Sequence, residues 1–115
     1  MISSSDIIAT LFTTYILYYM LNSKQTAYLK ALSHPINPVV QIGLKGLTDS
    51  VIKEIDVNLN AHELIKIKVQ SDSKDNREGL WVSICQKLRA EPINHIGKLL
   101  VIFRPNPKKT KITLP

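Results

Sequence analysis

VVQIGLKGLT, residues 39–48, is the stretch of sequence that decides the fold. Residues 39–42 are β-branched apart from one glutamine, which is typical of a short strand. Gly43 and Gly46 indicate a tight turn, and Thr48 is a favourable N-cap for a helix. The stretch therefore predicts a strand, a glycine loop and a helix amino terminus in direct succession.

The helix after Thr48 is expected to extend to about Asn60. Its apolar residues recur at helical spacing: Val51, Ile52, Ile55 and Leu59. Residues 64–69 then alternate with period 2, which predicts a strand with one buried face and with Lys66 and Lys68 pointing into solvent. A second strand is thus expected soon after this helix.

Three further segments complete the predicted domain on the carboxyl side. A polar connector, residues 71–76, supplies the cap of a helix that extends to about Arg89, and residues 92–96 are extended. Residues 97–98 form a turn into LLVIF, residues 99–103. This is the most apolar strand, so we expect it in the interior of the sheet.

On the amino side, a helix is expected from Asn22 or Ser23 to about Leu32. The run Ser33-His34-Pro35 ends it, because the residue before a proline avoids the helical conformation. The predicted order is α-β-α-β-α-β-β, an α/β fold with a four-stranded mixed sheet. Helices separate successive strands until a final hairpin.

Charge is distributed unevenly along the chain. Fifteen Lys+Arg against nine Asp+Glu give a net charge of +6. Residues 1–20 contain one charged side chain, Asp6, so residues 21–115 carry fifteen positive and eight negative charges, or +7. A basic excess of this size on a small domain favours a polyanionic partner, either nucleic acid or an anionic membrane.

The loop Gly43-Leu44-Lys45-Gly46 is the first candidate for a contact with nucleic acid. Glycines three apart let the backbone approach a ligand closely, because neither carries a side chain. The following helix amino terminus favours an anion, and Lys45 adds a positive charge at the tip. This GXXG arrangement clamps the nucleic-acid backbone in KH domains. Two glycines at this spacing also occur in plain turns, so the loop alone leaves both interpretations open.

Basic residues elsewhere could extend this contact. The candidate RNA-binding residues outside the loop are Lys24, Lys30, His34 and Arg104, and lysines of the tail, residues 106–115, could join them. Lys24 and Lys30 lie six residues apart on the first helix, so they point in different directions. His34 could contact the RNA or could only satisfy a backbone carbonyl at the helix end. The sequence does not place these residues together.

Catalytic chemistry has no support in the sequence. There is no Walker loop, nucleophile elbow or metal-ligand spacing, so we expect no enzyme, metal, cofactor or small-molecule substrate. The single cysteine, Cys85, has apolar neighbours, which fits a small buried residue in a reduced, cytoplasmic protein. The carboxylates are best explained as helix-end and surface charges: Asp49, Glu54, Asp56 and Glu63.

The amino-terminal residues differ from the rest of the chain. Residues 7–21, IIATLFTTYILYYML, form an uncharged run that is shorter than the roughly 20 apolar residues of a membrane-spanning helix. The run could associate with a membrane, pack as an added element, or not normally be translated, and Met20 would open a soluble domain. We favour the last interpretation. The expected parts are residues 1–20, a domain over 21–105 and a basic tail over 106–115.

Five blocks occur in order between residues 21 and 115: LKALSHPINPVV (29–40), IGLKGLT (42–48), HELIKIK (62–68), IGKLLVIFRP (96–105) and KITLP (111–115). Together they resemble the CRM domain (chloroplast RNA splicing and ribosome maturation), in its single-domain bacterial YhbY type. The resemblance implies an α/β fold similar to the C-terminal domain of bacterial initiation factor three. It also implies RNA binding, with ribosomal RNA or a precursor of the large ribosomal subunit as the partner.

In that family the GXXG loop and the basic surface beside it are the inferred RNA contact, which maps here to Gly43, Leu44, Lys45 and Gly46. Two alternatives stay open at this point. One is a module that docks on a protein, with its basic charge incidental. The other is a membrane-associated protein that uses residues 7–21 together with the basic domain, although we do not expect a membrane partner.

Overall fold

The structure is a computed structural model, and it describes residues 21–115. Seven elements follow one another: α2 (Ser23–Ser33), β1 (Val40–Ile42), α3 (Asp49–His62), β2 (Leu64–Val69), α4 (Lys74–Leu88), β3 (Glu91–Ile96) and β4 (Leu99–Phe103). This is the predicted α-β-α-β-α-β-β order, so the fold class predicted from the sequence is confirmed. The predicted segment 1–20 lies outside the described residues.

The four strands form one mixed sheet in the order β1-β2-β4-β3. β1 pairs in parallel with β2, whereas β4 is antiparallel to both β2 and β3. The LLVIF strand β4 is therefore interior, as its apolar sequence predicted. Because Ile42 pairs with Val69, the carboxyl ends of β1 and β2 meet at one end of the sheet, and the glycine loop begins there.

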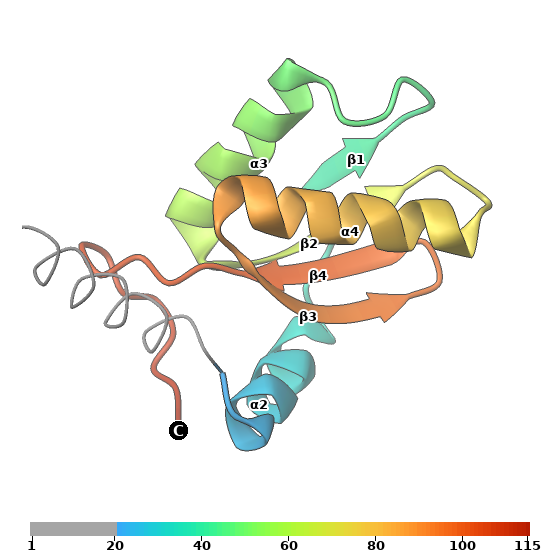
Figure 1. Ribbon diagram of the computed structural model, residues 1–115. Helices are drawn as coiled ribbons and strands as arrows, with labels where there is room; N and C mark the ends of the chain where they lie inside the picture. The colour runs from blue at the N-terminus through green and yellow to red at the C-terminus, as the bar shows by residue number, and fades with distance from the viewer. Residues whose placement is uncertain (1–20) are drawn as a thin grey trace, which may run out of the picture.

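Helices cover both faces of the sheet, which gives three layers (Figure 1). α3 and α4 lie on one face, above a core that includes Ile55, Ile67 and Leu100. α2 lies on the other face, over a smaller core that includes Leu29 and Phe103. Successive residues of a strand point to opposite faces, so β2 and β4 contribute side chains to both cores.

Lys66 departs from the prediction for β2. The alternating pattern predicted that Lys66 and Lys68 both point into solvent, yet Lys66 is only 9% exposed, whereas Lys68 is exposed. Both side chains project from the face of β2 that carries α2, because Ile67 and Val69 belong to the opposite core. The prediction was wrong for Lys66 because it assumed that only one face of the sheet is covered.

α3 ends two residues later than the sequence suggested. It continues to His62, and Glu63 forms its C-cap with φ 65° and ψ −50° while donating its backbone N–H to Leu59 O at 2.9 Å. Positive φ is uncommon for a residue with a side chain. Glu63 therefore lies at a helix end, as expected, but it is 1% exposed, so the expectation of a surface charge was wrong.

The Glu63 carboxylate fixes the tail, residues 106–115, to the domain. It accepts hydrogen bonds from three backbone N–H groups of the tail: those of Asn106 (2.6 Å), Lys111 (2.5 Å) and Ile112 (2.8 Å). Ile112 and Leu114 pack against the core beneath α2. The tail that the sequence presented as a basic appendage therefore contributes to the packing of the domain.

Candidate nucleic-acid interface

The glycine loop is a tight turn between the end of β1 and the start of α3 (Figure 1). The Gly46 N–H donates to Gly43 O at 3.1 Å, and Gly46 has φ +74°, which glycine adopts without strain. Leu44 is 92% exposed, and Lys45 is also exposed. The loop thus presents bare backbone and one positive charge to solvent.

The amino terminus of α3 behind the loop already has its own polar partners. The Thr48 side chain accepts from the Val51 N–H at 3.3 Å, and Asp49 lies in the first turn. Both complement the positive end of the helix dipole. An anion at the loop would therefore depend mainly on the loop backbone and Lys45.

A hollow of about 480 Å³ lies beside the loop, bordered by the connector between β2 and α4. Asp72 is the acidic residue in its wall. The Lys98 ammonium lies 2.9 Å from the Asp72 carboxylate and lowers its pKa, first through a hydrogen bond and then through its charge. The positive charge of Lys98 thus partly neutralises Asp72, the acidic residue that lines this hollow together with the glycine loop.

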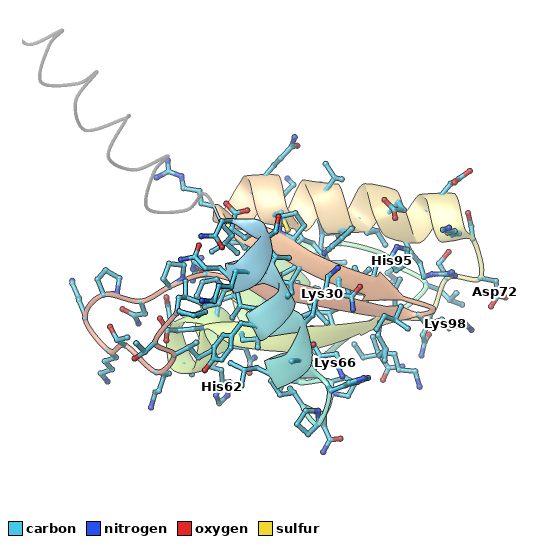
Figure 2. All side chains as sticks on the ribbon, turned by 90° about the horizontal axis from the view of Figure 1, so that it is seen from below. Lys30, His62, Lys66, Asp72, His95 and Lys98 are labelled. Carbon is cyan, nitrogen blue, oxygen red and sulfur yellow. The ribbon has the colours of Figure 1, made fainter. Side chains whose placement is uncertain are left out.

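The α2 side of the sheet brings further basic residues together. Lys30 lies in the last turn of α2 and His34 is the C-cap of that helix, and with Lys66 of β2 they line a small hollow. Figure 2 shows Lys30 and Lys66 along the same flank of α2. Lys68 is exposed two residues further along β2, toward the end of the sheet where the glycine loop begins. We call these residues, together with the loop, the basic strip: Lys30, His34, Lys66, Lys68 and residues 43–46.

Lys24 lies at the opposite end of α2 from His34. The neighbouring Gln25 donates its side-chain N–H to the Pro115 carbonyl at 3.3 Å. The amino end of α2 therefore lies beside the end of the tail and not beside the glycine loop. The structure does not bring Lys24 together with the other predicted residues of α2.

Arg104 is held between α3 and α4. Its Nη1 lies 2.8 Å from the Asp56 carboxylate and donates to Leu88 O at 3.0 Å. Its Nη2 donates to the Asp56 carbonyl and to the Asn60 side chain at 3.2 and 2.9 Å. Asn60 and Leu88 lie in the last turns of α3 and α4, where a positive charge complements the helix dipole. The donors of Arg104 are thus in use within the fold, and its contact with RNA stays a prediction.

Three further observations concern a reactive thiol, a metal site and a membrane-spanning helix. Burial, together with the negative charge of Glu91, raises the pKa of the Cys85 thiol to about 12, so this thiol is protonated near neutral pH. Within residues 21–115, no three His, Cys, Asp or Glu side chains are grouped so that they could hold a metal ion. In the same part of the chain, no helix is both long and apolar enough to span a membrane.

Comparisons relate the chain to known proteins. The family model described as the CRS1 / YhbY (CRM) domain matches residues 21–104. A Haemophilus influenzae protein named "RNA-binding protein" is 41% identical over 95 residues, which are 83% of this chain and 95% of the relative. The Bacillus subtilis protein named "Probable RNA-binding protein YqeI" is 29% identical over 96 residues, which are 84% of this chain and 100% of the relative.

A solved structure resembles the fold as well. The solution structure of a hypothetical protein from Staphylococcus aureus matches with a TM-score of 0.74 and 38% sequence identity. The match covers 84% of this chain and 100% of the other. The similarity therefore extends over one complete domain of the same architecture.

Proposed function

Because the chain belongs to the CRS1/YhbY (CRM) family, we propose that it binds RNA through the basic strip. The partner is ribosomal RNA within precursors of the large ribosomal subunit, and the protein acts in assembly of that subunit in the cytoplasm. The observation that carries the proposal is that an exposed glycine loop follows β1, and that the paired strand β2 carries Lys66 and Lys68 on its α2 side. The names of the relatives in Haemophilus influenzae and Bacillus subtilis support RNA as the partner.

The strip suits the RNA backbone better than individual bases. Base-specific recognition usually requires aromatic side chains on which bases stack. Trp81 is not available for this role, because its indole N–H donates to Val101 O at 3.2 Å and its ring packs against His95. Lysines and loop backbone hold phosphates without reading sequence, so the protein recognises the shape of folded RNA.

RNA affinity is expected to fall steeply as salt rises. If the four lysines of the strip each displace counterions from a phosphate, log K against log salt has a slope of about −3. Raising salt from 50 to 200 mM then weakens binding about 60-fold. Filter binding or fluorescence anisotropy with a fragment of precursor ribosomal RNA measures this slope.

The alternative of a protein-docking module makes the opposite prediction. In that case, association with isolated large-subunit precursor particles would survive both high salt and nuclease treatment. Such an outcome, or a slope near zero with purified RNA, would overturn the proposed function. Loss of association after nuclease treatment supports it.

A further inference from the structure

Lys66 is a buried lysine without a counter-charge among the described residues. It is 9% exposed, and within residues 21–115 its Nζ donates only to the His34 carbonyl, at 3.5 Å, which is the outer limit of a hydrogen bond. None of the three ion pairs among residues 21–115 includes it. An ammonium has three N–H donors, so most of the donors of Lys66 have no protein partner within the described part of the chain.

The hollow at Lys66 is lined by basic and neutral groups. It measures about 170 Å³, and its wall contains Lys30, Ala31, Ser33, His34, Lys66, Asn94, Ile96, Leu99 and Val101. No carboxylate is among them. Lys30 and His34 are exposed at its rim, and Lys66 forms its floor on β2. Figure 2 shows Lys30 and Lys66 on the same flank of α2, so both can reach one ligand there.

Burying an ammonium is costly unless an anion or several acceptors replace its water. An apolar side chain would fill the position on β2 at lower cost. The uncompensated charge, the absence of acidic groups in the wall and the two basic residues at the rim all favour a small anion.

We propose that the hollow between α2 and β2 binds one phosphate group of the RNA backbone, with Lys66 as its buried counter-charge. This inference rests on the proposed function and adds a specific site to it. Lys66 lies three residues before Val69, whose partner Ile42 directly precedes the glycine loop. At about 3.3 Å per residue, the hollow is roughly 10 Å along the strand from the start of the loop. The RNA backbone is therefore held at two separate points of the domain, at the hollow on the α2 side of β2 and at the loop after β1.

The test compares Lys66→Met with Lys68→Met. Both variants remove one positive charge from the same face of β2, but only Lys66 lines the hollow. We expect Lys66→Met to weaken RNA binding about tenfold or more, and Lys68→Met to weaken it about threefold, as a general loss of charge would. Lys66→Met is expected to unfold at the same or a higher temperature than the unmodified protein, because the buried charge is gone. If Lys66 served folding alone, Lys66→Met would change the unfolding temperature and leave the RNA affinity unchanged.

Inorganic phosphate provides a probe that does not depend on RNA. Titration is followed by the amide NMR shifts of Ala31 and Asn94 in the wall of the hollow. We expect saturable shifts in the unmodified protein, weaker binding in Lys30→Met, and none in Lys66→Met. Lys30 is exposed, so its variant remains informative even if Lys66→Met does not fold.

The results of these two experiments can contradict the phosphate site without contradicting RNA binding, and the reverse. Equal loss of RNA affinity in the two β2 variants, or phosphate shifts that persist in Lys66→Met, would overturn the site while leaving RNA binding intact. Phosphate binding that requires Lys66, in a protein that binds no RNA, would support the site as one for free phosphate and would overturn the proposed function.

Discussion

Replacing Glu63 with alanine is expected to lower the free energy of unfolding by about 3 kcal/mol and to release the tail. The buried carboxylate accepts three backbone N–H groups of the tail, and its loss leaves them without an acceptor. Ile112 and Leu114 would then no longer be held against the core beneath α2. A domain of this size should melt roughly 15 °C lower. Thermal unfolding measures the loss, and limited proteolysis at Lys108 and Lys109 reports the release of the tail.

Glu54→Ala is the matched control, because Glu54 is an exposed carboxylate on α3. It should change the free energy of unfolding by less than about 0.5 kcal/mol. Glu63→Gly should be less damaging than Glu63→Ala, since glycine tolerates the positive φ at this position. If Glu63→Ala proves as stable as the control, the tail is not anchored by this carboxylate.

The double variant Gly43→Asp with Lys45→Glu is expected to weaken RNA binding about a hundredfold, or ~2.7 kcal/mol. It removes the positive charge at the loop tip and places two negative charges where phosphate would approach the backbone. The fold should tolerate it, because a Cβ at Gly43 meets only Gln70 Oε1, at 3.8 Å, and Gly43 does not have positive φ. Affinity for precursor ribosomal RNA is the quantity to measure, with the circular dichroism spectrum as a check on folding.

Gln86→Asp with Lys87→Glu serves as the charge-matched control. Both residues are exposed near the carboxyl end of α4, whereas the α4 residues beside the loop, Asn76 and Leu80, are nearer its amino end, and the net charge changes by the same amount. We expect this control to bind RNA within about threefold of the unmodified protein. Equal weakening by the two double variants would mean that net charge alone governs binding and that the loop has no particular role.

The order of elements could be predicted because each element carries a local signal. Thr48 caps α3 as expected, and LLVIF is interior because no polar residue interrupts it. The resemblance to the CRM domain likewise depends on short contiguous blocks, so it too could be recognised from the sequence. Local pattern was sufficient wherever the structure depends on neighbours in the chain.

Burial of charged groups could not be predicted, because it depends on distant segments. Lys66 is covered only because α2, more than thirty residues earlier, packs across that half of the sheet. Glu63 is covered only because the tail returns to it from more than forty residues later. Arg104 became a candidate on charge alone, yet its donors meet the ends of α3 and α4. Residue type and spacing contain no information on these three long-range contacts.

The long-range contacts of Glu63 and Arg104 also bear on the position of the glycine loop in the candidate interface. Each holds the carboxyl-terminal part of the chain against α3, and α3 in turn positions the glycine loop at its amino end. We expect these contacts to limit the motion of α3 and of the loop at its amino end, and a loop with little freedom loses little conformational entropy when RNA binds. We therefore expect the anchoring of the tail to favour the function that we propose.

Crosslinking of the native protein to RNA in cells, with mapping of both partners, tests the central claim most directly. The RNA side is predicted to map to precursors of large-subunit ribosomal RNA. The protein side is predicted to map to the glycine loop and to peptides containing Lys30 and Lys66. Crosslinks spread over cellular RNAs in proportion to their abundance, or confined to peptides from the outer face of α4, would contradict the account.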